Sequence, residues 1–283
     1  MRLLLLVMVT GLLAHFSRAA DTAPVKKSDV FEFTGRTEAA ALVEIRPRVT
    51  GYLTKLVAKE GAAVKKGDLL AEIDPRPFQI EVDAAQARLA QSEAHFRLTV
   101  TESDRVRKLF DSRAVAAEEM ERMAARATVA RAAFDLAKVE LTRAQLTLSA
   151  TKLTSPIDGR LGRFQLSEGN LVVADGGPSI VTVIGTDPVF GFFDVDERTL
   201  LRLRRAGLAE AGKLTVSVGL ADEDGYPHQT RLEFIDPRVD PATATVRFRT
   251  TLPNPKGLFV PGMFIRVRIV ANADGTAAPA RQP

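Results

Sequence analysis

Between residues 75 and 150, apolar and small residues recur at alternating steps of three and four, in two successive runs. The runs consist of Val82, Ala85, Leu89, Ser92, Phe96, Thr99, Ser103, Val106 and Phe110, then Met120, Met123, Ala127, Ala130, Phe134, Ala137, Leu141, Ala144 and Leu148. This spacing is typical of a heptad seam. The short connection at FDSRAVAAEE predicts an antiparallel coiled-coil hairpin over residues 75–150. At 1.5 Å per residue, each arm of about 35 residues would reach roughly 50 Å.

A glycine-punctuated β pattern flanks the hairpin on both sides, in residues 47–74 and 151–184. The two segments repeat at a constant offset of 108 residues, which matches Gly51 with Gly159, Leu53 with Leu161, Glu60 with Glu168, Gly61 with Gly169, and Val64 with Val172. The first glycine of each copy is predicted at a tight strand turn, and the second at a turn with positive φ. Two such halves would face each other and close one flattened barrel, which the hairpin interrupts.

Residues 185–271 predict a β-barrel domain built from several short strands and one small helix. Asp196 is placed to cap a helix in ERTLLRLRRAG, which Gly207 would end. In ATVRFRTTL, Val246, Phe248 and Thr250 alternate with polar positions, as in a strand with one buried face. The fold class is therefore mixed α and β, in an elongated chain of several domains.

The two ends of the chain carry other patterns. Residues 1–19 resemble a cleavable signal peptide, with Arg2, an apolar run and a small-x-small site at Ser17-Arg18-Ala19. An uncleaved anchor is the alternative, although the apolar run is short for about 30 Å of hydrocarbon. Residues 30–46 predict an N-terminal strand segment, in which DVFEFTGRTEA would be an isolated strand. Residues 272–283, rich in small residues and proline, predict a disordered tail.

Charge and composition exclude several functions. The formal net charge is +4 and falls to +2 if cleavage follows Ala19, so it gives no electrostatic reason to expect nucleic acid as the partner. Cysteine is absent, which removes disulfides, thiolate chemistry and a lipid anchor on cysteine. The three histidines, His15, His95 and His228, lie far apart in sequence.

No motif of an enzyme is present. Serine has no histidine partner, and neither a phosphate-binding loop nor an H-E-x-x-H pattern occurs. Lipoyl and biotinyl carriers present a lysine at the turn between their half-repeats, but here that junction holds the hairpin. Lys65 and Lys66 are interpreted as solvated turn residues. We therefore expect no catalytic residue, no cofactor and no metal site, and a carrier-type subunit would be revealed only by a modified lysine.

Five segments together resemble a known family. They are RPRVTGYLTKLVAKEGAAVKKGDLLAEIDPRPF, LTSPIDGRLGRFQLSEGNLV, DPVFGFFDVDE, EFIDPRVDPATATVRFRTTLPNP and LFVPGMFIRVRI. In this order they are similar to the periplasmic adaptor subunits, or membrane fusion proteins, of tripartite efflux pumps. The last three look more like adaptors of resistance-nodulation-division (RND) pumps than those of ABC exporters or type I secretion systems, which stay the alternative.

The resemblance implies an architecture and a set of partners. The expected fold is a lipoyl-like β-sandwich split by a long antiparallel α-helical hairpin and followed by a β-barrel domain, with the family's membrane-proximal domain largely missing. The implied function is that of a non-catalytic periplasmic adaptor between an inner-membrane RND-type transporter and an outer-membrane channel protein. The copies would form a hexameric ring that seals a conduit for exported drugs or toxic compounds. The chain would be exported to the periplasm and associate there with the inner membrane.

The resemblance also implies a docking site at the hairpin tip. Family members carry an Arg-x3-Leu-x6-Ser pattern where the tip meets the outer-membrane channel. Arg105 and Leu109 have this spacing here, but the third position holds Ala116 instead of serine. The expected roles are directional hydrogen bonds from Arg105 and apolar burial by Leu109. Plain alternatives are a solvated arginine and ordinary packing of the leucine.

Overall fold

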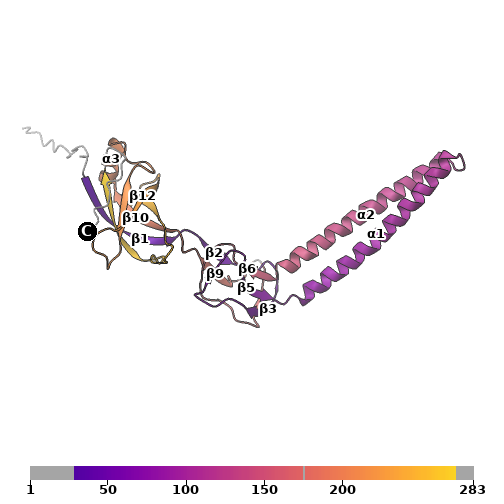
Figure 1. Ribbon diagram of the computed structural model, residues 1–283, viewed down its shortest axis with the longest axis horizontal. Coiled ribbons are helices and arrows are strands. Elements are labelled where there is room, and N and C mark those ends of the chain that lie inside the picture. Colours follow the sequence, from indigo (N-terminus) through magenta and orange to yellow (C-terminus); the bar gives the residue numbers. More distant parts are fainter. Residues whose placement is uncertain (1–28, 175, 272–283) are drawn as a thin grey trace, which may run out of the picture. The chain divides into compact units, whose positions relative to one another are not determined.

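The computed structural model describes residues 29–174 and 176–271 (Figure 1). The expected signal peptide at residues 1–19 and the expected tail at residues 272–283 lie outside the described residues. The described chain forms two compact units, a barrel and a sandwich that carries the helical hairpin. Each unit is built from segments far apart in the sequence.

The barrel unit closes six strands on themselves in the order β1-β10-β13-β12-β11-β14. The strands are β1 (Asp29–Ala39), β10 (Val189–Asp196), β11 (Thr215–Gly219), β12 (His228–Ile235), β13 (Thr245–Leu252) and β14 (Phe264–Ala271). Phe193 and Phe248 are almost completely buried inside, with ring centroids 5.7 Å apart. On β13, Val246, Phe248 and Thr250 point inward and are buried, which confirms the predicted alternation.

The prediction of an isolated strand in DVFEFTGRTEA is wrong. This segment is β1, which pairs with β14 residue by residue, from Asp29 opposite Ala271 to Arg36 opposite Phe264. Its inward-facing Phe33 stacks on Phe193 with centroids 5.9 Å apart. The segment therefore completes the barrel, and only the next strand, β2 (Leu42–Ile45), belongs to the sandwich.

A short helix, α3 (Glu197–Arg205), follows β10 as predicted. The Asp196 carboxylate accepts a hydrogen bond from the Thr199 backbone N–H at 2.9 Å, which caps the helix. Burial of Asp196 opposes ionisation, but the hydrogen bonds from Thr199 outweigh it and lower the pKa of the carboxyl. The chain leaves the helix at Gly207, whose φ of +69° few other residues adopt readily.

The sandwich unit packs two four-stranded sheets, ordered β2-β9-β7-β4 and β6-β5-β3-β8. Besides β2, the strands are β3 (Gly51–Leu56), β4 (Ala63–Val64), β5 (Leu69–Ile73), β6 (Lys152–Thr154), β7 (Gly159–Leu161), β8 (Leu171–Val172) and β9 (Val181–Ile184). The core between them is aliphatic and includes Leu53, Leu70, Ile73 and Ile180, all fully buried. Each half of the sequence repeat contributes strands to both sheets, so neither half has a core of its own.

The sequence repeat is confirmed as a pseudo-two-fold exchange between the halves. Gly51 of β3 pairs with Val172 of β8, and the offset counterpart pairs Gly159 of β7 with Val64 of β4. Two backbone hydrogen bonds follow the same exchange: the Gly61 N–H donates to the Leu161 carbonyl at 2.9 Å, and the Gly169 N–H to the Leu53 carbonyl at 2.7 Å. Gly61 and Gly169 have φ of +73° and +87°, as predicted.

Two glutamates latch the halves across this pseudo-axis. The Glu60 carboxylate accepts a hydrogen bond from the Phe164 backbone N–H at 2.8 Å. The Glu168 carboxylate accepts one from the Leu56 backbone N–H at 2.7 Å. Donors and acceptors are again related by the repeat offset. The matched glutamates, which the sequence marked only as turn residues, thus join each half to the other.

The prediction that Gly51 and Gly159 occupy tight turns is wrong. Both open a strand, and neither has positive φ. Each glycine instead permits a close approach, because an added Cβ would lie 2.6 Å from Ile73 Cγ2 at Gly51 and 2.3 Å from the Ile184 carbonyl oxygen at Gly159.

The hairpin consists of α1 (Arg76–Asp111) and α2 (Ala117–Ser149), which lie side by side (Figure 1). It is inserted between β5 and β6, which are neighbours in one sheet. Every predicted seam position has reduced exposure on both helices. Phe96 and Phe134 stack across the seam with centroids 5.9 Å apart. The packing seam is confirmed, while a supercoil stays a prediction.

Candidate docking site at the hairpin tip

The tip is a five-residue connection, residues 112–116, whose geometry is fixed mainly by backbone hydrogen bonds. The Ala114 N–H donates to the Leu109 carbonyl and the Arg113 N–H to the Phe110 carbonyl, both at 2.8 Å. This pair of bonds defines a Schellman motif, which usually has glycine in the left-handed position. Here Arg113 holds that position with φ of +61°. The chain therefore turns sharply at the end of α1.

Arg105 and Leu109 lie one turn apart on the last part of α1, on the same side of the helix. Arg105 is exposed and forms no ion pair within the described ranges, 29–174 and 176–271. Leu109 is 41% exposed, which is high for a leucine. These two side chains are available to a partner, because Leu109 offers an apolar contact and Arg105 a guanidinium without an ion pair in the described chain.

Ala116 lies across the connection and has a structural role that its sequence position did not reveal. It is the N-cap residue of α2, with extended backbone (φ −75°, ψ 155°) and no side-chain cap. The serine of the family pattern would therefore fall on the position where a hydroxyl caps a helix best. The backbone carbonyl of Ala116 accepts a hydrogen bond from the Glu119 N–H at 3.2 Å. The structure thus places Arg105, Leu109 and Ala116 in one tip region, with the third at a capping position.

The first turn of α2 is acidic and internally paired. Glu118 and Glu119 follow the N-cap, which suits the positive end of the helix dipole. Glu119 forms a hydrogen-bonded ion pair with Arg122, which lowers the pKa of its carboxyl. Glu119 and Arg122 therefore neutralise one another within the first turns of α2.

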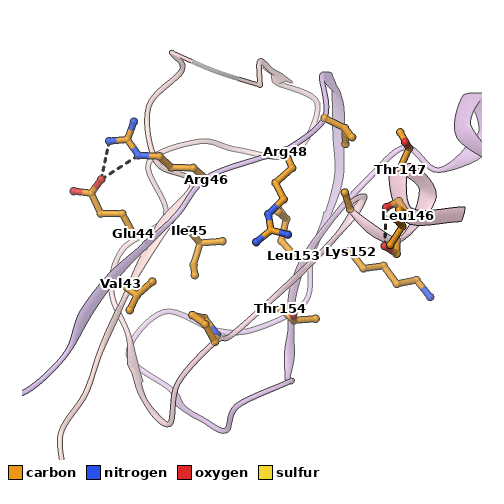
Figure 2. Close-up of a pocket in the computed structure, with 14 residues that line it drawn as sticks. Val43, Glu44, Ile45, Arg46, Arg48, Leu146, Thr147, Lys152, Leu153 and Thr154 are labelled. Atoms are coloured by element: carbon orange, nitrogen blue, oxygen red, sulfur yellow. Dashed lines mark hydrogen bonds and ion pairs between the residues drawn. The ribbon is translucent and has the colours of Figure 1, made fainter. Parts of the chain in front are cut away.

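A groove of about 770 Å³ lies at the other end of the hairpin, between β2 and the segment after it, the end of α2, and β6 (Figure 2). Arg46 is held by Glu44 through hydrogen bonds of 2.8 and 3.3 Å. Arg48 extends between Ile45 and Leu153 (Figure 2), and it forms no ion pair in the described part of the chain. The lining is cationic and aliphatic and contains no acid–base or nucleophile pair.

Other groups with potential chemistry lie apart. His95 is in the hairpin and His228 in the barrel, where its Nε2 is 2.8 Å from Glu223 Oε1. Among the residues described, no three His, Cys, Asp or Glu side chains gather as ligands for a metal ion. Lys65 and Lys66 lie exposed where β4 leads into β5, as interpreted from the sequence. No helix among residues 29–174 and 176–271 combines the length and the hydrophobicity needed to cross a membrane.

Comparison with known proteins matches both units of the fold. Residues 41–184 match the barrel-sandwich hybrid domain of RND membrane fusion proteins, and residues 188–273 match their β-barrel domain. The chain is 34% identical to the multidrug efflux pump subunit AcrA of Escherichia coli over 244 residues, which cover 84% of this chain and 61% of AcrA. It is 35% identical to the multidrug resistance protein MexA of Pseudomonas aeruginosa, over 84% of this chain and 60% of MexA. The chain therefore spans less than two thirds of either relative.

A solved structure supports the same assignment. A MacA–MexA chimeric protein that contains the α-hairpin domain of Pseudomonas aeruginosa MexA aligns with a TM-score of 0.65 and 26% identity. The alignment covers 86% of this chain and 82% of the chimera. The hairpin, the split sandwich and the barrel thus occur together in a solved relative. This chain belongs to the periplasmic adaptor, or membrane fusion protein, family of RND efflux systems.

Proposed function

We propose that the chain is a non-catalytic periplasmic adaptor that links an inner-membrane RND-type transporter to an outer-membrane channel. The proposal is carried by one observation: the hairpin leaves the sandwich between two neighbouring strands, in a chain whose two domains match the RND adaptor families in order. AcrA is named as a subunit of a multidrug efflux pump. The cargo would accordingly be drugs or other toxic compounds.

The mechanism is one of assembly. Several copies, six by the family resemblance, stand side by side in a ring, and their hairpins bundle into a tube whose tips meet the channel. The sandwich and barrel rings continue the tube and seal it against the periplasm. Each copy meets the next through unlike surfaces, which closes a ring. The transporter supplies the energy, so the adaptor needs no cofactor, and nucleic acid has no part in the assembly.

The tip makes the contact with the channel in this proposal. Arg105 donates directional hydrogen bonds to carbonyl or carboxylate oxygens, and Leu109 buries apolar surface against a helix of the channel. The exposure of both side chains and the lack of an ion pair at Arg105 within the described chain support this role. Ala116 contributes its position at the start of α2 rather than a side-chain hydrogen bond.

Arg105→Asp tests the proposal in the bacterium that carries the gene, with the chromosomal copy deleted. The wild-type chain should restore drug resistance and lower the accumulation of a fluorescent efflux substrate. Arg105→Asp should fold normally but restore neither, because it reverses the charge at the docking surface. Arg107→Asp, with the same charge change two positions along α1 on another face, is the matched control. Full resistance with Arg105→Asp at normal expression would refute the tip assignment.

A further inference from the structure

The groove at the base of the hairpin carries positive charge that no carboxylate of the described chain neutralises. Arg48 and Lys152 both line it, both are exposed, and neither forms an ion pair or a side-chain hydrogen bond within the described chain. Arg46 lines the groove too, but it is paired with Glu44, the one carboxylate of the lining. The unpaired charge therefore belongs to Arg48 and Lys152.

Apolar side chains lie beside this charge. The Arg48 side chain extends between Ile45 and Leu153 (Figure 2). Ile45 and Leu153 belong to the sandwich core and are 7% and 6% exposed, so they form the floor of the groove. Val43 is half-buried and Leu146 is 66% exposed, so both offer hydrocarbon at its walls. The groove thus combines a cationic centre with accessible apolar surface.

The C-terminal end of α2 borders the groove, and helix carbonyl groups ordinarily repel an anion. Here hydroxyl groups already occupy two of these carbonyls. The Ser149 hydroxyl donates to the Leu146 carbonyl and the Thr151 hydroxyl to the Leu148 carbonyl, both at 2.7 Å. The side chain that the helix end adds to the lining is the apolar Leu146. Charge and hydrocarbon are therefore separated along the groove, with the charge at Arg48 and the hydrocarbon toward the helix.

We propose that this groove binds an amphiphilic organic anion with a single hydrocarbon chain, such as a medium-chain carboxylate. The planar guanidinium of Arg48 would bind the carboxylate through two parallel hydrogen bonds, and Lys152 would add a second positive charge. The chain would lie against Val43 and Leu146. The groove volume of about 770 Å³ falls within the usual range of small-molecule sites. The site goes beyond the adaptor role, because it requires neither the hairpin tip nor the barrel.

Titration calorimetry of the purified chain with octanoate, decanoate and dodecanoate, all below their micellar concentrations, tests both parts of the ligand. One molecule should bind per chain. Affinity should rise by about two- to four-fold with each added methylene, depending on how fully the groove removes it from water. Dodecyltrimethylammonium has the same tail with the opposite charge, and it should not bind.

Substitutions separate the charge from the hydrocarbon. Arg48→Glu should weaken dodecanoate binding by about ten- to hundred-fold, the usual worth of a hydrogen bond to a charged group, and Arg48→Gln by less. Leu146→Ser should reduce the dependence on chain length. Arg163→Glu is the matched control, because Arg163 is an exposed arginine of the same sandwich that lies outside the groove and has no ion pair in the described chain. It should bind like the wild type, and unchanged melting temperatures without ligand would show that each variant is folded.

Hydrogen–deuterium exchange locates the site. Dodecanoate should protect residues 43–49 and 146–154 and leave the hairpin tip, residues 105–120, unchanged. Equal weakening in Arg48→Glu and Arg163→Glu, equal affinity for the cationic amphiphile, or protection confined to other segments would overturn the proposal. Binding to phosphatidylglycerol vesicles without binding of monomeric dodecanoate would overturn it as well, and would assign the two cations to a membrane surface. Because these measurements use the isolated chain, their outcome is independent of efflux.

Discussion

Ala116→Ser tests what the departure from the family's tip pattern does. Ala116 already has the extended backbone of an N-cap residue, and Glu119 lies three positions later. A serine hydroxyl there would accept a hydrogen bond from the Glu119 backbone N–H, as in the first half of a capping box. The N-terminus of α2 leaves its first backbone donors without helical partners, and the present alanine caps none of them by its side chain.

The expected gain is about 1 kcal/mol for the first turns of α2, the usual difference between serine and alanine at an N-cap. Because the hairpin tip is remote from both cores, this gain should appear as local protection rather than as global stability. One kcal/mol corresponds to about five-fold slower amide exchange. Hydrogen–deuterium exchange with mass spectrometry on a peptide covering Glu118 to Met123 measures it directly. Ala117→Ser, one position inside the helix, is the control and should give no protection.

Unchanged exchange in Ala116→Ser would show that the N-cap geometry is misassigned. If exchange slows while resistance is unaltered, the hydroxyl acts on the hairpin alone. If resistance also rises above that of the wild-type chain, the hydroxyl contacts the channel in addition. The pair of measurements therefore separates the two roles that a serine at this position combines.

Two further predictions concern the sandwich and the hairpin base. Glu60→Ala and Glu168→Ala should each lower the free energy of unfolding by about 0.5–1.5 kcal/mol in urea denaturation, because each removes one symmetry-related latch. Glu72→Ala, which removes no side-chain hydrogen bond within the described residues, is the control. A loss of stability in only one of the two latch variants would contradict the equivalence of the latches. Asp74 is bound by Arg76, which lowers its pKa from 3.8 to about 2, so its stabilising effect should be full above pH 3.8 and be lost as the pH falls through 2. The difference in melting temperature between wild type and Asp74→Asn should accordingly be present at pH 7 and vanish near pH 2; an equal difference at both pH values would refute the role of the ionised carboxylate.

The hairpin could be predicted from the sequence because its determinants are local. The seam positions recur within a few residues of one another, and the structure finds them shielded at the predicted places. The same holds for the cap at Asp196 and for the positive φ of Gly61 and Gly169, where one residue type fits one backbone state. The roles proposed for Arg105 and Leu109 come from the family resemblance alone, because no local pattern implies them.

Features that depend on distant partners could not be predicted in this way. β1 alternates like any strand, and only its distant neighbours β10 and β14, the latter more than two hundred residues away, make it part of the barrel. The glutamate latches join residues more than one hundred positions apart. The sequence repeat did contain a signal for the latches. Glu60 and Glu168 match at the repeat offset, although a turn by itself does not require a charged residue. Gly51 and Gly159 likewise match because atoms packed close to each of them leave no room for a Cβ.

The exchange between the half-repeats explains how the sandwich tolerates so long an insertion. The hairpin enters after β5 and returns at β6, where Glu72 lies opposite Lys152 in the same sheet, so its two ends are already neighbours. Two further contacts that join the halves, β3 with β8 and β4 with β7, use strands outside this junction. Length added between β5 and β6 therefore separates no pair on which the sandwich depends.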